Sequence, residues 1–227
     1  MSKKIHISGI EGHFLYALKD RLSRAGAILI EDRHIAEFVI SIGEGGSADM
    51  AILPPNIETD NPALIIKVHD LLSPEGKSTS WGDAELHRWA RLIRDGADIE
   101  LSSHEAPRHW VHVRDVCDAL CTLIMSNRDE PMTGVLNIAG RRAWSTDLIL
   151  QEMRMLWGRY SDSLSHTHTT KSLSSIPSPV NKSDPIEIDR PDLTLLHKYL
   201  RDCGSEGWHP LVPMRVALME ILAHASD

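Results

Sequence analysis

Short apolar runs alternate with amphipathic stretches along the first part of this chain. Residues 4–8 and 38–42 are apolar runs of strand length, and residues 12–25 place apolar side chains at helical spacing. Gly26 follows as the expected end of this helix, and residues 27–32 predict another strand. The chain is therefore expected to open with a strand, a helix and a second strand, as parallel α/β sheets do.

The same alternation resumes after an interruption. Glycines and prolines within residues 43–62 break any regular pattern, so no element is expected there. Further strands are expected at residues 63–68, 99–101, 110–113 and 135–138, and further helices at residues 83–94, 114–126, 145–158, 192–201 and 213–224. The pattern predicts an α/β core over residues 1–140 and a small C-terminal subdomain over residues 141–227 that packs on it.

Composition and charge narrow the class of protein. The 227 residues are 42% hydrophobic, which is enough for a core that folds alone. The net charge of −8, without a run of lysines or arginines, argues against nucleic acid or an anionic membrane as the main partner. No apolar stretch approaches the roughly 20 residues of a membrane span, and the chain enters a strand without a signal-peptide core. A cytoplasmic protein is therefore expected.

Cysteines and histidines do not predict a metal site. Cys117 and Cys121 share one face of an expected helix, which favours buried thiols over a metal or redox pair. His166 and His168 have the spacing of a metal clip, but they stand in a stretch rich in serine and threonine. No bound metal is expected.

The turn after the first strand has the pattern of a phosphate-binding loop. Gly9 and Gly12 lead from this strand into the first helix. In the full G-x-x-G-x-x-G fingerprint a third glycine lets helix and strand pack closely, and Leu15 stands in that place. Glu31 and Asp32 end the second strand, where a carboxylate would bind the ribose hydroxyls of a dinucleotide. The alternative is that both acids begin a solvated loop and bind no ligand.

Four motifs in order resemble one family. Residues 9–12, 108–116 (RHWVHVRDV), 135–140 (VLNIAG) and 207–213 (GWHPLVP) are similar to motifs of the extended short-chain dehydrogenase/reductase family, the nucleotide-sugar epimerases and dehydratases. Family members carry R-x-F-V-H-V-x-D-V, G-x-x-Y-N-I-G and G-W-x-P at matching positions. The resemblance spans most of the chain. It implies a Rossmann-like parallel sheet with helices on both faces, here reduced in size, and a C-terminal helical subdomain of the substrate-binding type.

The departures from the family concern its chemistry. Family members carry an active-site Ser or Thr and a Tyr-x-x-x-Lys pair, which should lie within residues 43–62, and that stretch contains no tyrosine. Tyr16, Tyr160 and Tyr199 are not followed four residues later by lysine. Glu11 would in addition repel a pyrophosphate. The resemblance thus implies NAD or NADP as cofactor, with binding that is weakened or lost.

Arg108 is the candidate for binding a substrate. In the family the arginine at this position contacts the substrate diphosphate, and a planar guanidinium suits phosphate oxygens. The alternative is a surface arginine paired with Glu105 or Asp115. Separately, Asp115 is expected to cap the helix that it begins.

Few residues could replace the missing acid–base pair. His69 and Asp70 follow the strand at residues 63–68, at the sheet edge where open α/β sheets bind ligands, and Lys77 is close in sequence. The alternative is a polar loop. His112 and Asn137 are expected to serve the structure rather than a ligand.

Two function classes follow. The first is a catalytically degenerate member of the epimerase/dehydratase family that binds a nucleotide or nucleotide-sugar. The alternative is a non-catalytic regulatory or scaffold subunit that binds a partner protein. A homodimer through the helix at residues 83–94, with Trp81 and Trp89, is a further hypothesis, and core packing is the alternative for both tryptophans.

Overall fold

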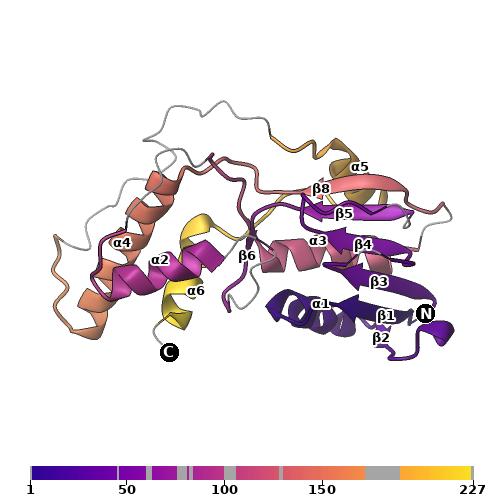
Figure 1. Cartoon of the computed structure of the whole chain (residues 1–227), viewed down its shortest axis with the longest axis horizontal. Helices are drawn as coiled ribbons and strands as arrows, with labels where there is room; N and C mark the ends of the chain where they lie inside the picture. The colour runs from indigo at the N-terminus through magenta and orange to yellow at the C-terminus, as the bar shows by residue number, and fades with distance from the viewer. Residues whose placement is uncertain are drawn as a thin grey trace.

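A six-stranded parallel sheet organises the amino-terminal part of the molecule (Figure 1). The computed structural model describes residues 2–44, 46–59, 63–75, 81, 84–99, 106–127, 130–171 and 190–225. The strands are β1 (Lys4–Gly9), β2 (Ile28–Leu29), β3 (Phe38–Ile42), β4 (Met50–Leu53), β5 (Leu64–Val68) and β8 (Gly134–Ile138). They lie in the order β2-β1-β3-β4-β5-β8. The predicted α/β class, the Rossmann-like parallel sheet and its reduced size are confirmed.

The helices form two groups. α1 (His13–Arg24), α3 (Val113–Met125) and α5 (Thr194–Asp202) pack side by side against the sheet, with α5 on β8. α2 (Ala84–Arg94), α4 (Thr146–Leu164) and α6 (Met214–His224) pack on one another beyond the end of the sheet (Figure 1). A short 3-10 helix, η1 (Arg33–Ile35), precedes β3, and two short parallel strands, β6 (Leu71–Leu72) and β7 (Val111–His112), lie after β5. None of the described helices is long and apolar enough to cross a bilayer.

The two faces of the sheet are covered differently. Ile5, Ile40, Ile52 and Ile66 belong to the face that packs into one apolar cluster with α1, α3 and α5. On the other face, register aligns Ser8, Ser41, Ala51, Ile65 and Val135 across five strands, and Ser8 and Val135 at its ends are exposed. Among the described residues no helix packs on this second face, so they do not supply the helices expected there.

Loops take the place of helices on the second face because the connections are short. Seven residues separate β3 from β4 and ten separate β4 from β5, whereas a helical crossover needs about a dozen or more. The hydroxyl of Ser41 donates to the carbonyl of Glu44, and the ammonium of Lys67 donates to the carbonyls of Pro55 and Ile57. The first bond closes a turn directly after β3, and the bonds of Lys67 tie the described part of the loop after β4 to β5.

Most predicted elements are confirmed, with differences at three places. The strand expected at residues 27–32 is only Ile28–Leu29, so Glu31 and Asp32 lie beyond it. β4 was not expected, although its four residues are all buried. It is short and bounded by glycines and prolines, which hide its pattern. α4 continues to Leu164, six residues beyond its predicted end. The strand expected at residues 99–101 and the candidate Lys77 lie wholly or mostly outside the described residues.

Two apolar clusters hold the molecule together. The first joins the sheet to α1, α3 and α5 and includes Trp81, and the second joins α2, α4 and α6 and includes Trp89. Both tryptophans are buried, so core packing is confirmed for them and they offer no exposed contact surface. Each cluster draws on both sides of residue 140, and the domain boundary there stays a prediction.

The two cysteines of α3 lie in the first cluster. Cys117 and Cys121 are both buried, as expected. Burial raises the pKa of both thiols, so they are protonated at neutral pH and behave as small apolar side chains.

Candidate functional site

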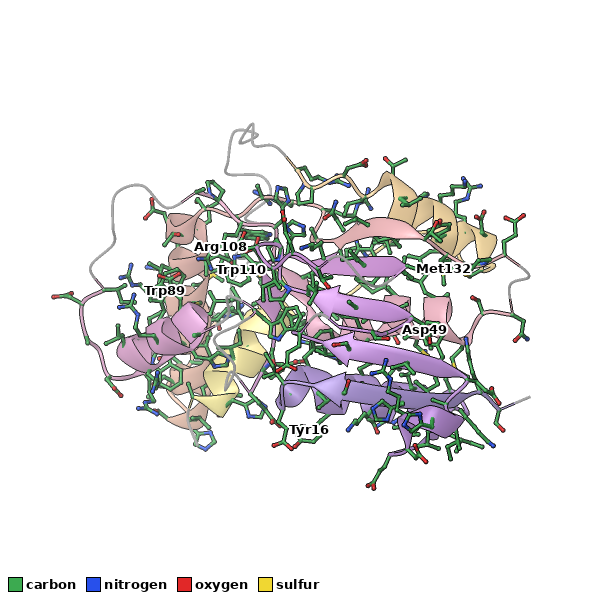
Figure 2. All side chains as sticks on the ribbon, turned by 45° about the vertical axis from the view of Figure 1, so that its right-hand side comes forward. Tyr16, Asp49, Trp89, Arg108, Trp110 and Met132 are labelled. Atoms are coloured by element: carbon green, nitrogen blue, oxygen red, sulfur yellow. The ribbon has the colours of Figure 1, made fainter. Side chains whose placement is uncertain are left out.

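All six strands point their carboxyl ends toward α2, α4 and α6 (Figure 1). Open α/β sheets bind ligands at this edge. Figure 2 shows Arg108 and Trp110 next to each other at this end, whereas Asp49 and Met132 lie at the opposite end of the strands. A ligand is therefore expected along this edge, which runs from β1 to β8.

Gly9 is required by the sheet itself. Its φ is +140°, and a Cβ at this position would lie 2.1 Å from the carbonyl oxygen of Ile42. The next residue, Ile10, donates its backbone N–H to the same carbonyl at 3.1 Å. Gly12 then begins α1 in an extended conformation, with no side chain capping the helix. The first glycine of the motif is therefore explained by the close approach of β1 and β3, without a ligand.

Side chains fill the space beside the glycine loop. The cavity lined by Gly12, Phe14, Leu71 and Trp81, among others, measures about 10 Å³, the room for one water molecule. The rings of Phe14 and Trp81 meet edge to face at 5.1 Å, and Leu15 is buried in the core. These residues do not fit the pyrophosphate of a dinucleotide, and the carboxylate of Glu11 lines the same cavity.

The acids after β2 have a local role. The carboxylate of Asp32 accepts the backbone N–H of His34 at 2.9 Å and so caps η1. Glu31 is exposed beside it. The solvated-loop alternative thus describes Asp32, and ribose binding by either acid stays a prediction.

An open cleft lies at the other end of the carboxyl edge, beside β8. It measures about 540 Å³ and is lined by Arg190, Pro191, Asp192, Leu193, Thr194, His197 and Trp208. The indole N–H of Trp208 donates to the carbonyl of Ala139 at 2.9 Å, which fixes one wall to the residue after β8. The backbone N–H of Trp208 donates to Nδ1 of His197 at 3.1 Å, which orients that imidazole. The walls of this cleft are therefore set by hydrogen bonds to the sheet and to α5.

Two hydrogen bonds of Asn137 connect the end of β5 to this cleft. Nε2 of His69 lies 3.0 Å from Oδ1 of Asn137, and Nδ2 of Asn137 donates to the carbonyl of Asp192 at 3.1 Å. Asn137 satisfies a backbone group, as expected, and also holds the candidate His69. His69 thus lies one residue away from the lining of the cleft.

Asp70 orients the segment that carries Arg108. Its φ of +47° is uncommon for a residue other than glycine. Its carboxylate accepts the backbone N–H of His109 at 2.9 Å, and its carbonyl accepts that of Val111 at 3.1 Å. Because this carboxylate is held by the chain, Asp70 has a structural role, and its predicted acid–base role stays a prediction.

His109 was missed by sequence reasoning and lies near the same cleft. It is 7% exposed, and its Nδ1 lies 3.3 Å from the carbonyl oxygen of Gly140. Its Nε2 is buried without a hydrogen-bond partner among the described residues. Burial lowers the pKa of His109 and is the largest influence on it, whereas the hydrogen bond with the carbonyl of Gly140 and the charge of Asp70 raise this pKa by less. The imidazole is therefore neutral at pH 7.

Among the described residues, Arg108 is paired with Asp70 and Glu85 and not with Asp115. Its Nε lies 4.0 Å from Oδ1 of Asp70, and its Nη2 lies 3.5 Å from Oε2 of Glu85 at the start of α2. Its guanidinium also lies 5.2 Å from the ring centre of Trp110. Glu105 lies outside the described residues. The 540 Å³ cleft is lined by Arg190 rather than by Arg108, so the sequence motif drew attention to a different arginine.

His112 and Asp115 both have structural roles, but the helix-capping role predicted for Asp115 belongs to His112. His112 is the residue that caps α3, because its Nδ1 accepts the backbone N–H of Arg114 at 3.2 Å. Its Nε2 lies 3.0 Å from Oε2 of Glu220. Asp115 was wrongly expected to cap this helix. It lies in the first turn and instead accepts the backbone N–H groups at residues 211 and 212, at 2.8 and 3.2 Å.

Solved structures share this fold over nearly the whole chain. No protein-family model matches the sequence, and a search of curated proteins found no match. RMD from Pseudomonas aeruginosa, complexed with NADPH, has a TM-score of 0.59 at 13% identity, with 99% of this chain and 98% of that chain covered. UDP-glucose 4-epimerase from Thermotoga maritima, with UDP-glucose, has a TM-score of 0.57 at 12% identity, with 97% and 98% covered.

A third structure extends the comparison to a dehydratase. dTDP-glucose 4,6-dehydratase from Bacillus anthracis, in complex with NAD, has a TM-score of 0.58 at 10% identity, with 99% of this chain and 97% of that chain covered. At such identities the likeness concerns the fold. The resemblance predicted from the four motifs is confirmed at that level. This chain has the fold of the NAD-dependent nucleotide-sugar epimerases and dehydratases.

Proposed function

We propose that this chain binds a nucleotide-sugar in the cleft beside β8 and does not carry out the hydride transfer of the enzymes whose fold it shares. The observation that carries the proposal is the contrast in space along the carboxyl edge. The cleft with Arg190 measures about 540 Å³, within the range of about 300–1,000 Å³ usual for ligand sites. The cavity beside the glycine loop measures about 10 Å³.

The chemistry of the cleft suits a diphosphate. Arg190 brings a guanidinium to its lining, and the carboxylate of Asp192, the acid in the described lining, already accepts the backbone N–H of Thr194 at 2.9 Å. Thr194 and His197 add a hydroxyl and an imidazole, and Trp208 adds an apolar wall. Thermotoga UDP-glucose 4-epimerase, which shares the fold, was solved with UDP-glucose. Arg190 replaces Arg108 as the first residue proposed for diphosphate binding.

Catalytic degeneracy is supported by the partners of the remaining candidates. Asp70 accepts a backbone N–H, and His69 meets Asn137, so among the described residues neither side chain is paired with a hydroxyl or an ammonium as in a Tyr-Lys pair. The residues beside the glycine loop do not fit NAD or NADP.

Calorimetry of the full chain tests this proposal. Titration with UDP-, GDP- and dTDP-sugars should give saturable binding to at least one, with a Kd of about 1–100 µM, and titration with NAD and NADP should give none. Arg190→Gln should weaken binding about tenfold. The matched control is Arg154→Gln, an exposed arginine on α4, which should leave binding unchanged. Absence of binding to every nucleotide-sugar would contradict the proposal.

A second candidate function is a non-catalytic subunit that binds a partner protein. It is favoured by the second face of the sheet, where loops replace helices and Val135 is 51% exposed. The test is light scattering on the protein purified from its native cell. A lone species of 25.4 kDa, with no stoichiometric partner, would contradict this candidate.

A further inference from the structure

The imidazole of His197 lines the 540 Å³ cleft, and its two nitrogens are in different surroundings. His197 belongs to the first turn of α5 and is half-buried. The segment that leads from α5 toward α6 returns beside it and brings Gly207, Trp208 and His209 next to the ring. These neighbours determine what the ring can offer to a ligand.

One hydrogen bond assigns the position of the ring hydrogen. The backbone N–H of Trp208 lies 3.1 Å from Nδ1 of His197, and an amide N–H can only donate. Nδ1 is therefore the acceptor, and the neutral ring carries its hydrogen on Nε2. Within the described part of the chain, Nδ1 is the nitrogen of this ring that makes a hydrogen bond. The Nε2–H group is thus left as a donor for a ligand.

Gly207 sets the place of the ring. A Cβ on Gly207 would lie 2.3 Å from Cε1 and 2.5 Å from Nδ1 of His197, so a side chain there would displace the imidazole. The φ of Gly207 is +99°, a conformation that glycine adopts without strain. Its N–H donates to Oγ of Ser205 at 3.0 Å, which fixes the turn. The backbone therefore lies directly on the ring because this residue has no side chain.

Two further contacts hold the same segment beside the ring. The ring of His209 meets that of His197 edge to face, with centroids 5.8 Å apart. The indole N–H of Trp208 donates to the carbonyl of Ala139, the residue after β8, which ties the segment to the sheet. The Nε2–H donor is therefore in place before any ligand arrives, and such preorganisation lowers the entropy cost of binding.

The polar groups of the cleft select acceptor atoms on a ligand. Every nitrogen of the Arg190 guanidinium is a donor, and Nε2 of His197 adds a directed donor to the same lining. The carboxylate of Asp192 is already engaged by the backbone N–H of Thr194. Diphosphate oxygens only accept hydrogen bonds, whereas sugar hydroxyls and bases also have donors to satisfy. The diphosphate is therefore the part of a nucleotide-sugar that these two donors fit best.

We infer that His197 is a specificity-determining residue that donates its Nε2–H to a diphosphate oxygen, and that Gly207 is the residue that positions it. This inference rests on the proposed function, because it names the second group that meets the diphosphate beside Arg190. Gly207 acts on the ligand only through the imidazole. A change at Gly207 therefore matters for binding only while His197 is present.

Calorimetry of the full chain with two probes tests the role of His197. The first probe is whichever of UDP-glucose, GDP-mannose and dTDP-glucose binds most tightly, and the second is its nucleoside diphosphate, which lacks the sugar. His197→Ala should raise the Kd of both probes about tenfold, because both keep the diphosphate. No loss for either probe, or a loss confined to the nucleotide-sugar, would overturn this inference alone. A wild-type chain that binds no nucleotide-sugar would overturn the proposed function as well.

Two glycines separate positioning from backbone strain. Gly207→Ala should raise the Kd of the nucleotide-sugar about tenfold. Gly204→Ala is the matched control, since its φ of +85° is also positive and a Cβ there meets no atom within 4 Å, and it should leave the Kd within about twofold. In a His197→Ala background, which leaves room for the methyl group, Gly207→Ala should have no further effect. An additive loss there, or an equal loss with Gly204→Ala, would refute the positioning role.

Nitrogen-15 NMR of the wild-type imidazole keeps the test decisive if a variant unfolds. The spectrum should show the hydrogen of His197 on Nε2, with Nδ1 as the acceptor. Addition of the nucleoside diphosphate should shift the Nε2 resonance more than the Nδ1 resonance. A hydrogen on Nδ1, or an Nε2 resonance that the saturating probe does not shift, would overturn the inference.

Discussion

The glycine loop and the cleft beside β8 occupy the same edge of one sheet, yet they are built in opposite ways. Around the glycine loop, Phe14, Leu15 and Trp81 fill the space with apolar side chains. Beside β8, the hydrogen bonds of Trp208 and Asn137 fix polar walls and leave about 540 Å³ between them. The comparison teaches that a glycine motif and a binding site are separable, because Gly9 serves the contact with β3 in either case.

The largest expected effect tests whether the glycine-loop region is truly packed. Trp81→Ala should lower the free energy of unfolding by about 3–5 kcal/mol, because it leaves a large hole next to Phe14 in the first apolar cluster. Urea denaturation measures the change. Tyr16→Ala, at a side chain that is 56% exposed on α1, two residues after Phe14, is the control and should stay within about 0.5 kcal/mol. Equal effects of the two changes would mean that the region is not a core.

Glycine substitutions separate the structural role of the motif from backbone strain. Gly9→Ala should cost about 3 kcal/mol, because its Cβ would meet the carbonyl of Ile42 at 2.1 Å and its φ is positive. Gly26→Ala, where φ is +90° and no atom lies within 4 Å, should cost about 1 kcal/mol. Thermal unfolding of both variants checks this. A Gly9 variant as stable as the Gly26 variant would remove the close-approach argument.

Two arginines sharpen the comparison at the ligand side. Arg190→Gln should raise the Kd of a nucleotide-sugar about tenfold, and Arg108→Gln by less than about threefold, since Arg108 is held by Asp70 and Glu85. Calorimetry with the sugar that binds most tightly measures both. If Arg108→Gln weakens binding more than Arg190→Gln does, Arg108 contacts the diphosphate, as the sequence motif implies.

The smallest expected effect is on the pH dependence of stability. Burial lowers the pKa of His109 and His112, so in the folded state they stay neutral where the unfolded chain begins to bind protons. Above about pH 6.5, the ordinary pKa of histidine, both imidazoles are neutral in the folded and the unfolded chain, so their contribution to stability is fully present. As the pH falls toward the folded pKa, the unfolded chain binds protons first, and this part of the free energy of unfolding is lost. Urea midpoints should therefore fall between pH 7.5 and pH 5.5.

A variant assigns part of that pH dependence. His109→Gln should flatten the fall in the urea midpoint, because glutamine does not titrate. His34→Gln, at an exposed position, is the control and should keep the full fall. An unchanged pH profile for the His109 variant would show that the buried imidazole does not titrate between the two states.

Periodicity was sufficient for most of the fold and insufficient at its shortest pieces. α1, β3, α2, α3 and α6 follow from apolar residues at regular spacing. β4 was missed because four buried residues between glycines and prolines carry no readable period. The second face could not be foreseen either, because a resemblance to helix-covered sheets says nothing of which crossovers have been shortened.

The site was less predictable than the fold for a physical reason. Spacing identifies which residues lie on one element, whereas the cleft beside β8 is assembled from residues 190–197 and 208, joined to β8 only by hydrogen bonds in three dimensions. Arg190 follows a stretch of chain without periodicity, so no pattern singled it out. His109 could have been noted as a histidine beside the candidate Arg108, but its contact with the carbonyl of Gly140 joins residues 31 positions apart in sequence.

The short connections between β3, β4 and β5 have a consequence for how the chain folds. Parallel sheets usually form slowly, because each strand pair must wait for a long crossover to close. Here, seven and ten residues bring successive strands together, so these pairings become nearly local in sequence. The centre of the sheet can therefore assemble early and serve as the nucleus onto which β1, β8 and their helices condense.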